Sequence, residues 1–386
     1  MESTFTTVYA EEIPDQYQVI KRLGQGTFGD VLLIQDKNTG KPMAVKLVRK
    51  DRIKQKAFLK ELSMSISLSN HQGIITTYPI FIETLDHYLM TQELAIAGTL
   101  HDLIEPQVGM PEDMVKRCAI QLAWALDFMH SRGLVHRDLK PDNVLLMDKE
   151  CHTIKLCDFG LTEIIGSIAT KMSHIIPYMS PELCALKRNQ FLVMTPSVDS
   201  WAFAVLLFVA LTGNFPWKEA MAEDILYKVY KFWQKSDNLF PPPALWEKFT
   251  KEALMMFNKF FSQDPISRPS VLSILSCTPY TWRIEECYQE VATEAEGGTE
   301  EIEFVTIQDQ EPTEQGGEDT GEFQCIIIQD QESTMEGEDN LERVHFVIIQ
   351  EQELHALYPE MDPCDPDLIL ISENETLALG SEVEIP

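Results

Sequence analysis

The chain has 386 residues, 44% of them hydrophobic, which is enough for one large buried core and a second region. Its formal net charge of −30 at pH 7 argues against binding to nucleic acid, because a phosphate backbone repels an acidic protein. The eight cysteines show no CxxC spacing, and this favours free thiols over disulfides or a zinc site.

The N-terminus is predicted to be a short extension, residues 1–16. Its first twelve residues carry three glutamates and lack the basic and apolar stretches of a signal peptide. The longest apolar run, 201–211, is shorter than the roughly 20 residues that a membrane span requires, so it predicts a buried helix. We therefore expect a protein of the cytoplasm, with the nucleus as a second location, and no membrane partner.

Apolar and polar residues alternate in 17–49, and glycine and Asn-Thr-Gly turns interrupt them, which predicts three antiparallel strands. Residues 52–70 predict a helix, and 74–82 and 87–93 predict two more strands. Helical periodicity then takes over, as in 110–132. The predicted fold class is α+β, with a β-rich small lobe before a helical large lobe.

A glycine-rich segment joins the first two predicted strands: Leu23-Gly24-Gln25-Gly26-Thr27-Phe28-Gly29-Asp30-Val31. Its glycines let backbone amides approach phosphate groups without obstruction by side chains. A plain hairpin and a dinucleotide-binding turn are alternatives. Because the dinucleotide turn opens into a helix, the strand predicted after this segment favours a loop that covers nucleotide phosphates.

A lysine and a glutamate are candidates to hold those phosphates. Lys46 ends the next strand in Ala44-Val45-Lys46, where it can reach the α- and β-phosphates if an acid fixes it. Glu61 is the only acid in the predicted helix 52–70. Taken alone, a lysine at the end of a strand and a glutamate on a helix are most often solvated surface charges, so their meaning depends on the motifs that follow.

Three further motifs follow in order: His136-Arg137-Asp138-Leu139-Lys140-Pro141-Asp142-Asn143, Asp158-Phe159-Gly160 and Ser180-Pro181-Glu182. Phosphoryl transfer needs groups that position a hydroxyl, hold magnesium and neutralise charge. Asp138 is the candidate to orient the hydroxyl and accept its proton, and Lys140 to neutralise the moving phosphoryl group. Asn143 and Asp158 offer oxygen ligands for Mg²⁺.

This ordered set resembles the protein kinases, and residues 106–118, 125–130 and 211–217 are similar to the SBK (Src-homology-3-binding domain) kinases. The resemblance covers about 17–275 and implies a serine/threonine protein kinase that uses ATP and Mg²⁺, with protein substrates. It implies Asp138, Lys140 and Lys46 as catalytic residues. The residues that it implies for ATP binding are Leu23, Gly24, Gln25, Gly26, Thr27, Phe28, Gly29, Val31, Ala44, Lys46, Glu61, Gln92, Glu93, Ala95 and Leu145.

The resemblance also implies structural roles. Gln92 should occupy the gatekeeper position, directly before the hinge residues Glu93 to Ala95. Asp199 should lie at the start of the buried central helix, and Arg268 should pair with Glu182.

Two positions depart from the pattern of active kinases. Where a threonine usually contacts the catalytic aspartate and lysine, this chain has Ile175, and His174 replaces the glycine before it. A hydrogen bond to a charged group contributes about 1.5–3 kcal/mol, so we expect reduced activity. Milder departures are Ser180 for alanine and Ala204 for glycine. The alternative to an active kinase is a pseudokinase scaffold that acts through its tail.

The predicted kinase domain spans 17–285, and an acidic tail spans 286–386. The tail has 29 acidic residues against one basic residue, Arg343, and is predicted to be mostly disordered. A 21-residue repeat places aliphatic residues before acids at 304–307, 325–328 and 346–349, and 368–371 has the same character. Such segments resemble SUMO-interacting motifs, which add a strand to a sheet edge. Low-complexity drift is the alternative.

Overall fold

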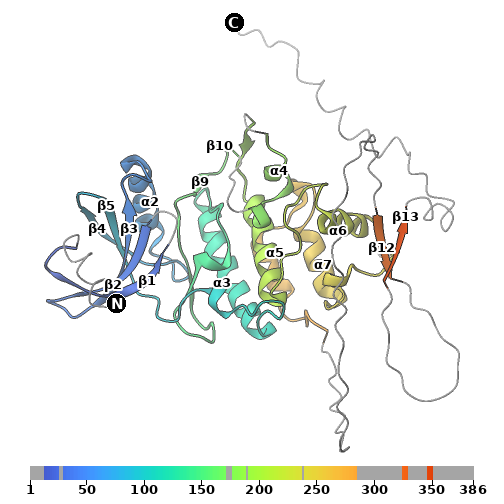
Figure 1. Ribbon diagram of the computed structural model, residues 1–386, viewed down its shortest axis with the longest axis horizontal. Helices are drawn as coiled ribbons and strands as arrows, with labels where there is room; N and C mark the ends of the chain where they lie inside the picture. The colour runs from blue at the N-terminus through green and yellow to red at the C-terminus, as the bar shows by residue number, and fades with distance from the viewer. Residues whose placement is uncertain are drawn as a thin grey trace, which may run out of the picture. The chain divides into compact units, whose positions relative to one another are not determined.

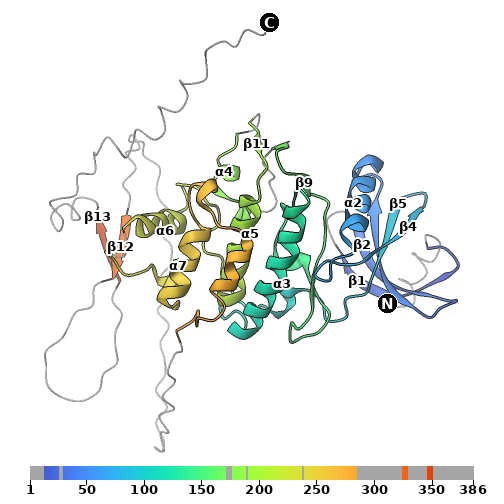
Figure 2. The same cartoon turned by 180° about the vertical axis from the view of Figure 1, so that it is seen from behind.

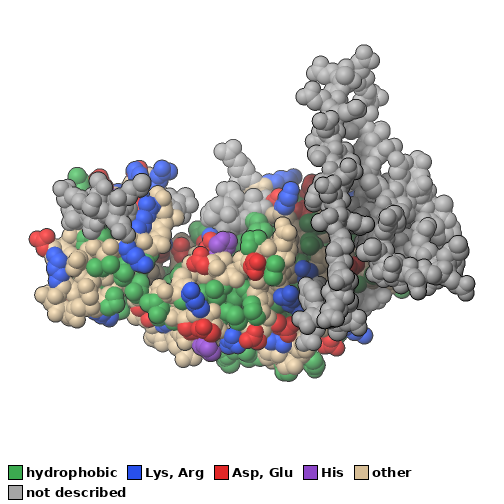
Figure 3. Space-filling model, turned by 60° about the horizontal axis from the view of Figure 1, so that its bottom comes forward, with side chains coloured by type: hydrophobic (Ala, Val, Ile, Leu, Met, Phe, Trp, Pro, Cys, Tyr) green, Lys and Arg blue, Asp and Glu red, His purple; other side chains and the backbone are tan. Residues whose placement is uncertain are grey.

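The computed structural model describes residues 13–25, 29–170, 176–187, 190–236, 239–284, 324–328 and 346–350. The chain divides into two compact units, Met1–Val291 and Ala292–Pro386. Within the first unit, a sheet with one helix precedes a larger helical part (Figure 1). This arrangement confirms the predicted α+β class. On the face that Figure 3 shows, acidic and basic side chains are interspersed over this unit.

The small lobe is a five-stranded antiparallel sheet with the strand order β1-β2-β3-β5-β4. Alternate residues point inward, so that Leu32 and Ile34 on one strand and Val45 and Leu47 on the next are buried. The strands are β1 (Tyr17–Gln25), β2 (Gly29–Asp36), β3 (Pro42–Arg49), β4 (Thr77–Glu83) and β5 (His87–Gln92). The five predicted strands are confirmed, although β4 begins three residues later than expected.

Helix α2 (Gln55–Leu68) packs on this sheet through a buried face of Phe58, Glu61, Leu62 and Ser65. This spacing is the 3.6-residue period of an amphipathic helix. The ring of Phe58 stacks on Tyr88 of β5 with centroids 5.2 Å apart. Glu61 therefore lies on the face of α2 that is turned toward the sheet.

The large lobe is built around α5 (Ser197–Thr212), all 16 residues of which are buried. Figure 2 shows α5 beside α3 (Glu112–Ser131) and α7 (Lys251–Phe260). The helix ends at Gly213, whose φ of 65° is left-handed and suits a residue without a side chain. The predicted buried helix is confirmed, and in the described part of the chain no helix is long and apolar enough to cross a membrane.

The remaining elements of the large lobe are short. Its other α-helices are α4 (Pro181–Cys184) and α6 (Ile225–Lys235). Its strands are β6 (Leu134–Val135), β7 (Val144–Leu146), β8 (Ile154–Leu156), β9 (Glu163–Ile164), β10 (Ile168–Ala169) and β11 (Leu192–Val193). Its 3₁₀ helices are η1 (Leu100–Leu103), η2 (Pro141–Asn143), η3 (Ile176–Tyr178), η4 (Ala244–Trp246), η5 (Pro265–Ser267) and η6 (Val271–Ser276).

In the second unit, two of the four aliphatic segments form strands, β12 (Gln324–Ile328) and β13 (Phe346–Gln350). They pair with each other antiparallel, with Ile326 opposite Ile348. Isoleucine, valine and phenylalanine favour extended backbone, which explains why these segments form strands in so acidic a region. The predicted disorder of the rest of the tail, and the segments 304–307 and 368–371, lie outside the described residues.

Candidate active site

The register of the small-lobe sheet aligns residues of the predicted nucleotide site. Gly24 pairs with Val31, and Val31 pairs with Lys46, so the three lie in one row across β1, β2 and β3. Ala44, two residues before the lysine, pairs with Gln92 at the end of β5. The hydrogen-bond register of the sheet thus places Gly24, Val31, Lys46, Ala44 and Gln92 on neighbouring strands.

Gly29 marks the closest approach between β2 and β3. A Cβ atom at this position would lie 1.7 Å from the carbonyl oxygen of Leu47, so that only glycine fits without moving a strand. Gly26, Thr27 and Phe28, which are predicted to cover phosphates, lie outside the described residues.

Lys46 connects the two lobes through two carboxylates. Its Nζ lies 2.7 Å from Oε1 of Glu61 on α2 and 3.4 Å from Oδ1 of Asp158. Burial opposes the charge of the lysine, but Asp158 and Glu61 outweigh it and raise the pKa of Lys46 above its ordinary value. The same lysine is the main cause of the lowered pKa of Asp158. Lys46 and Asp158 are therefore both charged at neutral pH.

Asp158 lies in a loop of unusual backbone conformation, with a φ of 63°. This left-handed conformation is uncommon for residues other than glycine. Behind it, the Phe159 ring is buried and packs edge-on against His136, with centroids 5.5 Å apart. The buried Phe159 ring holds the loop of Asp158 against the loop from His136 to Asn143, which we call the catalytic loop.

Asp138 is the centre of a second network. Nζ of Lys140 lies 3.0 Å from both of its carboxylate oxygens, and Nδ2 of Asn143 donates to Oδ2 at 2.8 Å. The same nitrogen donates to the Asp138 carbonyl oxygen at 2.7 Å. Since Asp138 is buried, these donors compensate the loss of hydration of its carboxylate. The candidate base, cation and amide thus come together as the motif spacing predicts.

Asp199, at the start of α5, fixes the backbone of that catalytic loop. Its carboxylate accepts hydrogen bonds from the amides of His136 at 2.8 Å and Arg137 at 2.9 Å, and Nε2 of His130 lies 2.9 Å away. Burial opposes its charge, but these interactions with His130 and the loop keep the pKa of Asp199 below its ordinary range. The resemblance placed Asp199 at the start of the central helix, but no sequence pattern indicated its contacts with the loop.

The predicted hinge follows β5. The Gln92 amide donates to the hydroxyl of Thr77 at 3.0 Å, which ties the gatekeeper position to β4. The Glu93 carboxylate binds Lys155 at 2.7 Å and accepts from the Thr76 amide, and the Glu93 amide donates to the Thr76 carbonyl oxygen at 2.9 Å. Ala95 and Leu145 are half-buried. Leu23, which lies in β1, is 40% exposed, and Gln25 is the last residue of that strand.

The ion pair between Arg268 and Glu182, which the family resemblance implied, is present. The guanidinium binds both carboxylate oxygens, at 2.6 and 2.7 Å, and lies 4.8 Å from the centroid of the Trp201 ring. Ile175 and His174, the two departures nearest to this region in sequence, lie outside the described residues.

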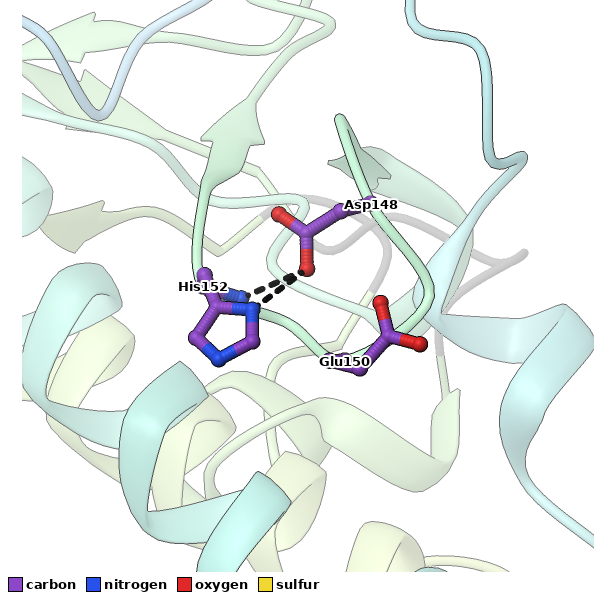
Figure 4. Close-up of side chains that lie close together, drawn as sticks. All are labelled: Asp148, Glu150 and His152. Carbon is purple, nitrogen blue, oxygen red and sulfur yellow. Dashed lines mark hydrogen bonds and ion pairs between the residues drawn. The ribbon is translucent and has the colours of Figure 1, made fainter.

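A cluster that resembles a metal site has a simpler explanation. Asp148, Glu150 and His152 bring one ligand atom each within 4.8 Å (Figure 4). However, both Asp148 oxygens already accept backbone hydrogen bonds, from the amides of His152 and Thr153 at 2.9 Å. These bonds close the turn between β7 and β8, so the cluster is a structural turn on the surface.

The fold and the two networks define a protein kinase, and residues 17–280 match the family model described as "Protein kinase domain". Mouse serine/threonine-protein kinase SBK1 is 46% identical over 265 residues, which are 69% of this chain and 63% of the mouse protein. Human serine/threonine-protein kinase SBK2 is 38% identical over 297 residues, 76% of this chain and 84% of the human protein. The chain therefore belongs to the SBK family of serine/threonine protein kinases.

Proposed function

We propose that this chain transfers the γ-phosphate of ATP to serine and threonine hydroxyls of proteins, with Mg²⁺ as the metal. The observation that carries the proposal is the Asp138 carboxylate, held by Lys140 and Asn143 next to the Lys46, Glu61 and Asp158 cluster. Such a transfer requires positioned charges rather than covalent catalysis, and these residues supply them.

The geometry suggests a role for each group. Asp138 accepts the proton of the substrate hydroxyl, and Lys140, 3.0 Å from it, neutralises the phosphoryl group as it moves. Lys46 contacts the α- and β-phosphates, and Glu61 fixes it there at 2.7 Å. A lysine two residues after the base is typical of serine/threonine kinases, which supports those hydroxyls as acceptors.

The residues fit a magnesium ion. Because Nδ2 of Asn143 donates to Asp138, the oxygen of its side chain is the atom left for a metal. Together with the Asp158 carboxylate it offers the hard oxygen ligands that Mg²⁺ prefers. When bound, Mg²⁺ supplies positive charge against the ATP phosphates.

A radiolabelled-phosphate assay tests this function. The full-length chain, with ATP, Mg²⁺ and a generic acceptor protein, should incorporate phosphate on serine and threonine. Asp158→Asn should reduce incorporation to background, because it removes the charged metal ligand. Equal incorporation by the wild type and this variant would instead favour the pseudokinase scaffold that Ile175 and His174 suggest.

We also propose that the tail binds SUMO through its aliphatic segments. The support is that 325–328 and 346–349 lie in the extended strands β12 and β13, since a strand is the conformation that adds to a sheet edge. The acids that follow each segment suit a basic partner surface. A single short strand must be ordered on binding and is expected to bind weakly.

Chains of SUMO should therefore bind the full-length protein more tightly than single SUMO. Linkers of about 21 residues reach about 25 Å, so each bound segment raises the effective concentration of the next. Titration with SUMO monomer and tetramer measures this difference. Alanine at Ile327, Ile328, Ile348 and Ile349 should reduce it, because only two of the four segments then remain, whereas alanine at Leu354 and Leu357, outside the segments, should not. Equal affinity for monomer and tetramer would contradict the proposal.

A further inference from the structure

The charged side chains of Lys60, Glu163 and Arg137, which belong to three separate elements, lie close together beside α2. Nζ of Lys60 on α2 lies 3.0 Å from Oε1 of Glu163 on β9. Nη1 of Arg137, in the catalytic loop, lies 3.9 Å from the same oxygen. One carboxylate oxygen thus faces a cation from each lobe of the kinase domain.

Both cations are next to residues of the candidate active site. Lys60 immediately precedes Glu61, which holds Lys46, so an ion pair at Lys60 restrains the turn of α2 that carries Glu61. Arg137 immediately precedes Asp138. Glu163 itself is fixed by strand pairing, because it lies opposite Val135 in the two-stranded sheet of β6 and β9. This acid therefore connects the helix that orients the lysine with the loop that carries the base.

Arg137 is a buried cation, so the charge of its partner Glu163 matters more than that of an ordinary surface ion pair. The side chain of Arg137 is only 6% exposed. Its Nη2 donates to the Thr170 carbonyl oxygen at 3.3 Å, but its Nε has no hydrogen-bond partner among the described residues. Burial lowers the pKa of Arg137, and the carboxylates of Glu163 and Asp199 oppose that effect. A guanidinium with so little hydration requires nearby negative charge.

The segment that runs from Asp158 to Glu182 offers one source of such charge, which is phosphate on Thr170 or Ser173. A phosphate would bring up to two negative charges beside Arg137. Glu163, however, lies in the same segment and already contacts both Lys60 and Arg137. This carboxylate is part of the chain as synthesised, whereas phosphate must be added by another reaction.

We propose that Glu163 is a positioning residue for phosphoryl transfer, and that its fixed charge between Lys60 and Arg137 keeps α2 in place without phosphate on the activation segment. The inference rests on the proposed function, because it concerns how the same site is held. It predicts a kinase that is active as synthesised, and in which the side chain of Thr170 is dispensable.

The test uses the full-length chain and five variants: Glu163→Gln, Glu163→Asp, Lys60→Met, the Lys60→Met and Glu163→Gln double variant, and Thr170→Ala. Glu83→Gln is the matched control, because Glu83 pairs with Lys50 at 2.7 Å on the sheet and contacts α2 at its first residue, Gln55, at 3.5 Å, six residues before Glu61. Each protein is treated with phosphatase, checked by mass spectrometry, and assayed for kcat, for KM of ATP and for affinity toward a fluorescent ATP analogue.

Glu163→Gln should lower kcat/KM about three- to tenfold, mainly through KM for ATP, because Lys46 is held less firmly. Glu163→Asp should recover part of the loss. Since Lys60 and Glu163 act as a pair, the double variant should be no worse than Glu163→Gln alone. Phosphatase-treated wild type and Thr170→Ala should keep their activity, and Glu83→Gln should match the wild type.

Three results would overturn the inference: Glu163→Gln matching Glu83→Gln, an additive double variant, or loss of wild-type activity after phosphatase treatment. If the untreated wild type transfers no phosphate, the proposed function fails separately. The affinity for the ATP analogue then decides the role of Glu163, which requires weaker binding in Glu163→Gln and unchanged binding in Glu83→Gln.

Discussion

Lys46→Met and Asp138→Asn are each expected to reduce phosphate transfer at least about a hundredfold. A positioned acid–base group such as Asp138 contributes roughly 10²–10⁴ to a rate, and the loss of a positioned group that stabilises charge, such as Lys46, costs about 10²–10³. Lys46 is held by two carboxylates at 2.7 and 3.4 Å, and in the proposed function it contacts the phosphates of ATP. Asp138 is buried among donors that orient its carboxylate. In the proposed function, both variants remove a group that serves the transition state.

Two neighbouring residues provide matched controls for this experiment. Lys50→Met removes a lysine just after β3 whose partner is Glu83 on the sheet. Asp142→Asn changes an exposed acid in the same catalytic segment as Asp138. Both controls should retain activity within a few-fold of the wild type in the radiolabelled assay. Near wild-type rates in Lys46→Met or Asp138→Asn would rule out the assigned roles, provided that thermal unfolding shows folded proteins.

Glu182→Ala is expected to lower the free energy of unfolding by about 3–5 kcal/mol, because it leaves a buried guanidinium without its counter-charge. The Arg268 side chain is fully buried and binds both oxygens of Glu182 at 2.6 and 2.7 Å. It keeps its bond to the Ser262 carbonyl oxygen at 2.8 Å and its contact with Trp201, which do not neutralise it.

Urea unfolding monitored by tryptophan fluorescence measures this difference. The control is Asp113→Ala, because Asp113 pairs with Arg117 at 2.7 Å but its side chain is 69% exposed, and such pairs contribute about 0–1 kcal/mol. Replacing both partners, Glu182→Leu with Arg268→Met, should recover much of the stability. A loss in Glu182→Ala no larger than in Asp113→Ala would contradict the structural role of the pair.

The sequence could predict those parts of the site that short motifs encode. Asp138, Lys140 and Asn143 lie within six residues of one another, so their spacing alone predicted one site, and they share hydrogen bonds. Glu61 was the only acid of its predicted helix, and the helical period places it on the buried face beside Lys46. In both cases local geometry was sufficient.

The sequence could not predict contacts that depend on tertiary packing. Asp199 binds the amides of His136 and Arg137 across more than 60 residues, and backbone amides leave no pattern in a sequence. Glu163 is an isolated acid, and only the pairing of β6 with β9 brings it to the edge of α2. Lys60 beside Glu61 was the one available signal, since it placed a cation next to a candidate site residue.

Protonation of Asp199 should impair both folding and catalysis, because this carboxylate binds the loop that carries Asp138. Its lowered pKa means that the carboxylate stabilises the folded state fully above the pKa of an unfolded aspartate, and that this contribution is lost as the pH falls through the lower, folded-state value. Protonation would weaken the acceptor of the His136 and Arg137 amides, which orient the loop of Asp138. Acid inactivation and acid unfolding of the large lobe should therefore begin at the same titration.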